Sequence, residues 1–221
     1  EPFKAAARRV DGTLNDAFMA AIAGGFREYH DRHGAMVGTL RMTMPISLRT
    51  EDDHEGGNHI TLVRFEVPVG RADPEDRMRE SGAICRAARA EPSLVFSNQV
   101  AAILNLLPSA AVGGMLKHVD LLASNVPGFP VEVFVSGAEV LGFYAFGPTT
   151  GASANVTLMS YRDTCHIGLN TDAGAVPDPD VLLACLRESF GELVALGRTA
   201  PKPRTAPRKR SPRRKPATTS D

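Results

Sequence analysis

Apolar residues recur along this chain at two different spacings, and the order of those spacings restricts the fold. Leu14, Phe18 and Phe26 follow the three- and four-residue spacing of a helix face. Elsewhere β-branched and aromatic residues alternate with polar ones, as they do in strands. We expect helices over residues 13–33, 74–90 and 178–197, two short helices within 94–116, and strands at 40–44, 60–67, 119–122, 131–135, 138–146, 153–161 and 165–170.

The resulting order is one helix, two strands, helices, several strands and a final helix, with no internal repeat. This order predicts the α+β class, in which a mixed β-sheet is covered by helices.

Short polar motifs mark the ends of the expected helices. Thr13–Asp16 has the pattern of a capping box, and Gly34 is a typical stop for the same helix. Asp73-Pro74 and Asp178-Pro179 each place an N-cap residue before a proline at the first helical position. We expect Gly197 to end the last helix, whose buried stripe should comprise Leu182, Leu183, Leu186, Phe190, Leu193 and Val194.

The segment Ser124-Asn125-Val126-Pro127-Gly128-Phe129-Pro130 separates two apolar runs of the alternating kind. Proline fixes its own φ and glycine tolerates a positive φ, so Pro127-Gly128 is predicted to form a type II turn between two strands.

The formal net charge of zero divides into an acidic body and a basic tail. Residues 198–221 hold nine Lys or Arg and one acid, which leaves 16 bases and 24 acids in residues 1–197. The tail has five prolines and only Ala as an apolar residue, so it cannot bury enough surface to fold. We expect one domain over 1–197 and a disordered, basic, Pro-rich tail over 198–221, able to contact anionic lipid through charge alone. Nucleic acid is not an expected partner, because the body is acidic.

Three cysteines, Cys85, Cys165 and Cys185, are widely separated and indicate neither a disulfide framework nor a zinc site. No apolar run reaches the length of a membrane span. We therefore expect a cytoplasmic protein, peripheral to a membrane or lipid droplet at most. Glu1 is not an initiator Met and no signal segment follows it, which predicts a processed product or a fragment of a longer reading frame.

The search for catalytic motifs is mostly negative. The chain has no Gly-x-Gly-x-x-Gly, P-loop, Gly-x-Ser-x-Gly or His-Glu-x-x-His pattern. The pairs His30/His33 and His54/His59 have spacings that occur in metal sites, but a helix end and a flexible loop explain them better, so no metal is expected. These residues alone define an α+β domain with a basic tail and no visible chemistry.

Four motifs, taken in order, resemble the C-terminal half of the bacterial wax ester synthase/acyl-CoA:diacylglycerol acyltransferases. They are Asn15-Asp16 at the start of a helix of small residues; Pro45-Ile46-Ser47-Leu48-Arg49 followed by Gly57-Asn58; Ser124-Asn125-Val126-Pro127-Gly128; and Gly147-Pro148, Ser160-Tyr161, Gly168-Leu169, Asp172 and Pro177-Asp178-Pro179-Asp180 near the end. The resemblance covers residues 4–197. Phe129 departs from it, since the family usually has a second proline there.

The resemblance implies one half of a fold like that of chloramphenicol acetyltransferase, with acyl-CoA and an alcohol meeting between two halves. It also implies a catalytic His, in a His-His-x-x-x-Asp-Gly motif of the N-terminal half, acting as general base. That motif is absent here, so we expect no catalytic residue in this chain and no activity from it alone. Acyl-CoA is implied as a substrate, with no separate cofactor, and the N-terminal half and diacylglycerol or a long-chain alcohol as partners.

The matching residues then receive roles. Asp16 and Asn15 are expected to stabilise the start of their helix or to contact substrate. Ser124 and Asn125, with Pro127 and Gly128, are expected either to donate hydrogen bonds to a thioester oxygen or to hold the junction between the halves. Arg49 is a candidate contact for CoA phosphates, with a surface ion pair as the alternative. Residues 94–116 are a candidate surface for acyl chains, with an ordinary buried helical hairpin as the alternative.

Two functions therefore remain open. The chain is either part of an O-acyltransferase that makes triacylglycerol or wax ester, or a non-catalytic module that keeps the fold and binds a lipid or a partner.

Overall fold

The computed structural model describes residues 1–47, 60–90 and 119–199. Their helices and strands follow the expected order, with one addition, the short N-terminal helix α1. The elements are α1 (Pro2–Arg8), α2 (Leu14–Arg32), β1 (Thr39–Ser47), β2 (Ile60–Pro68), α3 (Pro74–Arg89), β3 (Leu121–Val126), β4 (Phe134–Val135), β5 (Ala138–Glu139), β6 (Ala154–Tyr161), β7 (Thr164–Thr171) and α6 (Pro179–Arg198).

Five strands form one mixed sheet in the order β2-β1-β3-β6-β7. The three central strands β1, β3 and β6 run parallel, and the outer strands β2 and β7 pair antiparallel with their neighbours. The expected α+β class with a mixed sheet is confirmed. The predicted turn at Arg162-Asp163 joins β6 to β7, and Arg162 adopts a φ of 53° there.

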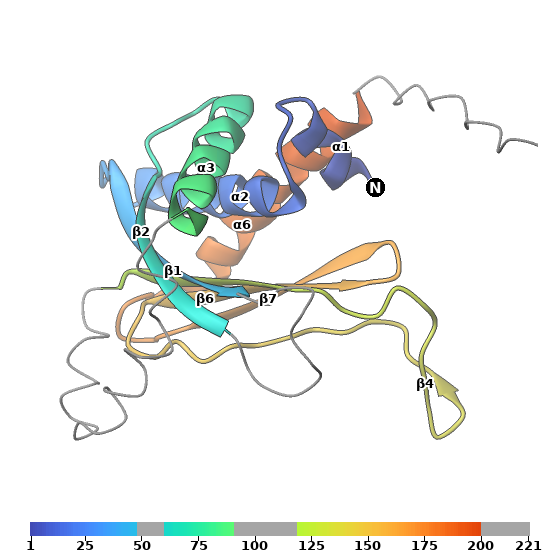
Figure 1. Cartoon of the computed structure of the whole chain (residues 1–221). Helices are drawn as coiled ribbons and strands as arrows, with labels where there is room; N and C mark the ends of the chain where they lie inside the picture. The colour runs from blue at the N-terminus through green and yellow to red at the C-terminus, as the bar shows by residue number, and fades with distance from the viewer. Residues whose placement is uncertain (48–59, 91–118, 200–221) are drawn as a thin grey trace, which may run out of the picture.

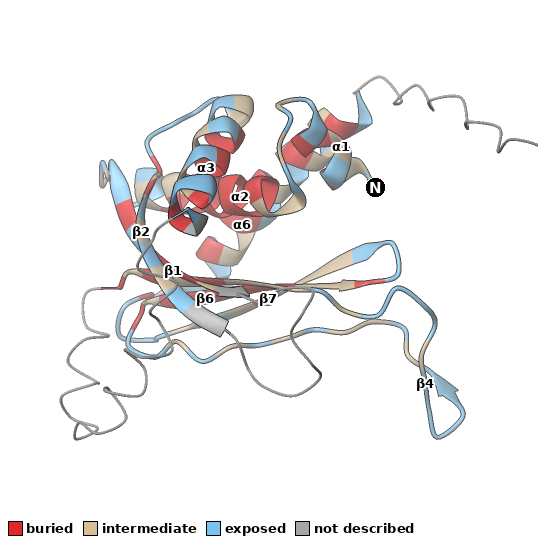
Figure 2. Cartoon of the chain, viewed as in Figure 1, coloured by how far each residue is buried: buried red, intermediate tan, exposed pale blue. Residues whose placement is uncertain are grey.

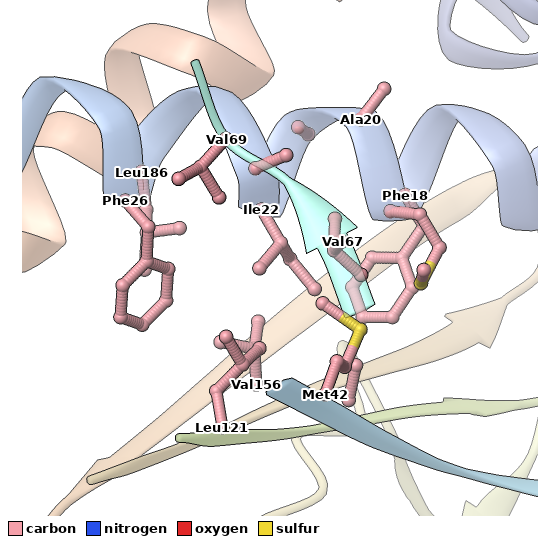
Figure 3. Close-up of a cluster of buried hydrophobic side chains, with 14 of the residues drawn as sticks. Phe18, Ala20, Ile22, Phe26, Met42, Val67, Val69, Leu121, Val156 and Leu186 are labelled. Carbon is pink, nitrogen blue, oxygen red and sulfur yellow. The ribbon is translucent and has the colours of Figure 1, made fainter. Parts of the chain in front are cut away.

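Helices α1, α2, α3 and α6 lie together on one face of this sheet (Figure 1). Buried residues gather between the helices and the sheet, as Figure 2 shows in red. Ile22 and Phe26 of α2 point toward Leu121 and Val156 of the central strands (Figure 3). The alternation of β3 and β6 explains this core, because every second side chain reaches the helical layer.

Helix α2 is the central helix of the layer and depends on its small residues. A Cβ atom at Gly25 would lie 2.7 Å from Leu186 of α6, so α2 and α6 are in close contact there. Gly197 lies inside α6 and does not end it, contrary to our expectation. A Cβ at Gly197 would lie 1.8 Å from the carbonyl oxygen of Pro2, so this glycine admits α1 against α6.

The predicted helix starts are largely confirmed. Thr13 and Asp16 form a reciprocal capping box at the start of α2, and Asp73 accepts a hydrogen bond from the Asp76 backbone at the start of α3. Asp178 occupies the N-cap position of α6, but its side chain makes no capping bond. Its carboxylate instead accepts hydrogen bonds from Tyr29 at 2.5 Å and His33 at 2.7 Å, because α2 ends beside it.

Residues 127–150 differ most from our expectations. The predicted strand at 138–146 is wrong beyond β5, and the one at 131–135 is reduced to β4. The segment instead runs past the face of the sheet that the helices leave open (Figure 1). Gly142 and Gly147 permit this course, since Cβ atoms there would lie 2.9 Å from His166 and 2.4 Å from Asn155. Packing against the sheet accounts for only part of the apolar pattern in this segment, since Leu141, Tyr144 and Phe146 remain exposed.

Candidate functional site

A cavity of about 350 Å³ lies on the open face of the sheet, between the central strands and the segment that crosses them. Its volume falls within the range of small-molecule sites. Its walls are mostly apolar and come from β1, β2, β3, β6 and the crossing segment: Thr43, Pro45, Leu62, Val119, Leu122, Ala123, Ser124, Val126, Ala145, Phe146, Gly147, Pro148, Thr150, Asn155 and Thr157.

The register of the parallel strands brings the polar groups of the cavity together. Thr43 lies beside Leu122, and Leu122 beside Asn155, in adjacent strands. Two residues further along, Ser124 lies beside Thr157. The polar side chains therefore occupy neighbouring positions within the three parallel strands, on the face of the sheet that the segment crosses.

Two of these polar residues hold the cavity wall. The Thr157 hydroxyl donates to the Asn155 side-chain oxygen at 2.9 Å, and the Asn155 amide donates to the Pro148 carbonyl at 2.8 Å. Their hydrogen-bonding groups are thereby used to fix the crossing segment over the sheet.

The hydroxyls of Thr43 and Ser124, which also line the cavity, make no hydrogen bond to another described residue. Thr43 is only 3% exposed, and its Oγ1 has no hydrogen-bond partner within the described residues. Ser124 Oγ likewise has none there. A buried hydroxyl without a partner is costly, so an acceptor from outside the described residues would stabilise Thr43 Oγ1.

Asn125 faces away from the cavity, although it adjoins Ser124 in the sequence. Its amide is 3.4 Å from the side-chain oxygen of Asn15, and the Asn15 amide donates to Cys85 Sγ at 3.3 Å. Asn15 and Asn125 thus connect the start of α2, helix α3 and the end of β3 on the helical face. The strand period of two puts the paired motif residues on opposite faces of the sheet.

Asp16 lies close to Asn15 but is occupied by its own helix. Its carboxylate accepts the Thr13 backbone N–H at 2.8 Å, and the residue is 4% exposed. Gly12 and Gly82 surround the carboxylate, since Cβ atoms there would lie within 3.4 Å of it. The geometry gives Asp16 a structural position at the α2 N-terminus.

The predicted type II turn at Pro127-Gly128 is wrong, because the chain makes no turn there and Gly128 lacks the positive φ that type II requires. Glycine is needed there for a different reason. A Cβ at residue 128 would lie 1.8 Å from the carbonyl oxygen of Ser160, and the Gly128 N–H donates to the Ser160 hydroxyl at 3.1 Å. The segment that follows β3 is therefore held directly against the end of β6.

None of the described residues that line the cavity carries a group that titrates near neutral pH. The perturbed groups of the described chain include a cluster at the helical face, where burial and the Asp178 carboxylate raise the pKa of Tyr29 to about 12.

Residues 56–194 match the model of the WS/DGAT C-terminal domain, where WS/DGAT denotes wax ester synthase/diacylglycerol acyltransferase. The chain belongs to this family. A putative diacylglycerol O-acyltransferase of Mycobacterium tuberculosis strain H37Rv is 36% identical over 201 residues, covering 89% of this chain and 41% of that protein. A probable diacylglycerol O-acyltransferase of Mycobacterium tuberculosis strain CDC 1551 is 28% identical over 203 residues, and the match covers 86% of this chain and 44% of that protein.

Solved structures agree with the WS/DGAT fold. The wax ester synthase/diacylglycerol acyltransferase of Marinobacter aquaeolei VT8 superposes with a TM-score of 0.66 at 19% identity, over 89% of this chain and 46% of that one. The PapA2 acyl transferase gives 0.56 at 11% identity, over 87% and 41%. This WS/DGAT domain thus spans less than half the length of each relative named here.

Several predicted residues of the WS/DGAT domain lie outside the described ranges. They are Arg49, the histidines His54 and His59, most of the basic tail, and all of residues 94–116. His30 and His33 are described, and each Nδ1 contacts a backbone carbonyl of α2, at Phe26 and Tyr29 respectively. The part of the chain that the structure describes holds no group of three metal-ligating side chains. It also holds no helix long and apolar enough to cross a bilayer.

The sequence reasoning missed Thr43, Asn155 and Thr157. Their signal was present, because Asn155 and Thr157 alternate with the apolar residues of β6. Polar alternation in a strand usually indicates a solvated face. Only the segment crossing that face turns it into the wall of a cavity.

Proposed function

We propose that this chain forms one wall of the substrate site in an O-acyltransferase. The complete enzyme transfers a fatty acyl group from acyl-CoA to diacylglycerol or a long-chain alcohol. Family membership supports the reaction class, and the apolar cavity with its two unpartnered hydroxyls supports the role of this part. The cavity carries the proposal, because an acyl thioester combines an apolar chain with a carbonyl acceptor.

The reaction divides between this chain and the remainder of the enzyme. The acceptor hydroxyl attacks the thioester carbon, a C–O bond forms, and the C–S bond breaks to release CoA thiolate. A base outside this chain takes the proton of the acceptor and returns it to the thiolate sulfur. Ser124 and Thr43 donate hydrogen bonds to the oxygen that becomes negative during attack.

The remaining expectations follow from this chemistry. Acyl-CoA enters as a substrate and no separate cofactor takes part, because transfer between a thioester and an alcohol is redox-neutral. Because the acceptor is apolar, we expect the enzyme to act in the cytoplasm, at the surface of a membrane or lipid droplet. The isolated chain should show no turnover, since the described part of the cavity wall offers no base.

The experiment is a hybrid enzyme in which this chain replaces the matched region of the 36%-identical mycobacterial relative. Transfer is measured from palmitoyl-CoA to dioleoylglycerol and to hexadecanol. Ser124→Ala should lower kcat about 100-fold if its hydroxyl supports the developing oxyanion. Thr164→Ala removes an exposed hydroxyl from β7 and is the matched control, expected to leave kcat unchanged.

A hybrid that binds palmitoyl-CoA without any turnover would contradict the proposal and favour the non-catalytic binding module. Equal kcat for Ser124→Ala and the control would remove the assigned role of the cavity hydroxyl.

A further inference from the structure

Two polar residues of the cavity form a chain of hydrogen bonds that ends on the crossing segment. The Pro148 carbonyl accepts the Asn155 side-chain amide at 2.8 Å, and the Asn155 side-chain oxygen accepts the Thr157 hydroxyl at 2.9 Å. Asn155 and Thr157 are only 6% and 3% exposed, and both line the cavity. The direction of each hydrogen bond follows from the chemistry of these groups.

The Pro148 carbonyl determines how the chain is oriented. A carbonyl oxygen only accepts hydrogen bonds, so the Asn155 group that faces it must be the NH2 group. The Asn155 oxygen therefore faces Thr157, and because that oxygen also only accepts, the Thr157 hydroxyl must donate to it. A hydroxyl has a single proton, so Thr157 Oγ1 has only lone pairs left for a ligand. No described residue donates to that oxygen.

The crossing segment is held in the position that this orientation requires. A Cβ at Gly147 would lie 2.4 Å from Asn155 Nδ2, so the absence of a side chain there lets the amide reach the next carbonyl. The Asn170 amide of β7 donates to the Gly147 carbonyl at 3.2 Å, from the other side of β6. Thr157 is therefore fixed as a hydrogen-bond acceptor before any ligand binds.

Ser124, the neighbour of Thr157 in the sheet, has the opposite capacity. The two residues are paired in register between the parallel strands β3 and β6, and both line the cavity. The Ser124 hydroxyl has no partner among the described residues, so its proton can be donated to a ligand. Neighbouring strands lie about 4.8 Å apart. The cavity thus presents a donor and an acceptor at about that separation.

We propose that Thr157 accepts a hydrogen bond from the pantetheine amide that lies nearest to the thioester of acyl-CoA. This inference rests on the proposed function, in which Ser124 donates to the thioester oxygen. Two methylene groups separate the thioester sulfur from that amide nitrogen, a link that can span the distance of about 4.8 Å between adjacent strands. Thr157 would then contribute to the selection of CoA thioesters as acyl donors.

The acceptor alcohol is the other hydrogen-bond donor that enters the reaction, and it fits Thr157 less well. Its hydroxyl proton must pass to the general base during attack, so a hydrogen bond from that proton to Thr157 would oppose the reaction. The amide N–H of pantetheine keeps its proton throughout the transfer. An acceptor that is fixed in advance therefore suits the amide.

The test compares two short thioesters that differ in one group. S-octanoyl-N-acetylcysteamine has the amide of pantetheine, and S-octanoyl-2-acetoxyethanethiol has an ester oxygen in place of the N–H. Each is titrated into the 221-residue chain by calorimetry and is also supplied as acyl donor, with hexadecanol, to the hybrid enzyme. The ratio of the two affinities is the readout, because a general loosening of the cavity weakens both ligands alike.

Three variants alter the hydrogen-bond chain. Thr157→Val removes the acceptor, Thr157→Ser retains it, and Asn155→Ala releases the Thr157 proton so that the hydroxyl can rotate and donate. The control is Thr164→Val, which makes the same chemical change at an exposed residue of β7 that does not line the cavity. Circular dichroism verifies that each variant is folded, and two independent positions guard against one that is not.

The unmodified chain should bind the amide ligand about 5- to 10-fold more tightly than the ester ligand, as expected for one neutral hydrogen bond. Thr157→Val should bind the two ligands equally, and Asn155→Ala should show a reduced preference. Thr157→Ser and Thr164→Val should keep the preference of the unmodified chain. In the hybrid enzyme, Thr157→Val should raise KM for the amide ligand and leave KM for the ester ligand unchanged.

Equal binding of the two ligands by the unmodified chain, or a preference that survives Thr157→Val, would overturn the inference. Absence of binding by both the unmodified chain and the hybrid enzyme would also overturn it. A Thr157-dependent preference in a hybrid without turnover would leave this inference standing while the proposed reaction fails.

Discussion

Replacing Gly128 with alanine tests the closest backbone approach near the candidate site. The added Cβ would lie 1.8 Å from the Ser160 carbonyl oxygen, whereas real Cβ atoms essentially never come within 3.0 Å of such a neighbour. The segment at residue 128 must therefore move away from β6, and the 3.1 Å hydrogen bond from Gly128 N–H to the Ser160 hydroxyl is lost or stretched.

The expected loss in free energy of unfolding has three parts. Overpacking against rigid backbone costs about 1–3 kcal/mol. The weakened hydrogen bond adds about 0.5–1.5 kcal/mol. The reduced entropy of the unfolded alanine chain returns about 0.4–1 kcal/mol. The net destabilisation is about 2–3 kcal/mol, which corresponds to a fall in Tm of roughly 5–10 °C for a domain of this size.

The assay is thermal unfolding followed by circular dichroism, with Gly191→Ala as the control. Gly191 lies within α6, and a Cβ there would meet no atom within 4 Å. Since alanine favours helix over glycine by about 1 kcal/mol, this control should raise Tm by about 2–4 °C. A Gly128→Ala protein as stable as the unmodified chain would refute the argument from close approach.

Three further predictions concern single groups. Hydrogen bonds from His33 to the Tyr29 carbonyl and the Asp178 carboxylate raise the pKa of its imidazole. The stability that the protonated ring contributes should therefore be complete below pH 6.5 and should disappear as the pH rises through the raised pKa. Urea unfolding at a series of pH values should show this dependence in the unmodified chain and not in His33→Ala. Thr43→Val should stabilise the free chain by about 1 kcal/mol, because the buried hydroxyl has no partner within the described residues. The same change should lower kcat of the hybrid enzyme, since the proposed hydrogen bond to substrate is lost. A loss of stability in urea unfolding would contradict this prediction. Thr13→Ala should destabilise the chain by about 1 kcal/mol through loss of the α2 cap, with KM of the hybrid unchanged; a raised KM would instead connect this helix start to substrate.

The sequence by itself determined the features that depend on neighbouring residues. The capping box at Thr13, the N-cap at Asp73 and the turn at Arg162-Asp163 were all predictable, because their hydrogen bonds and dihedral angles are local. The helix and strand periods also give the mixed α+β order, since burial on one face imposes a period of 3.6 or 2 on the sequence. The motif resemblance identified the family for the same reason, because its residues are contiguous.

Tertiary structure alone decided how those elements serve the candidate site. Gly128 and Gly197 are each required by a backbone that is distant in sequence, so no local turn rule could identify their role. Ser124 faces the cavity, whereas Asn125 faces the helices. These orientations are fixed by the register in which β3 pairs with the parallel strands β1 and β6. The apolar run at 138–146 crosses the sheet instead of joining it. Periodicity specifies which side chains share a face, whereas the contacts that cover that face are made by residues far along the chain.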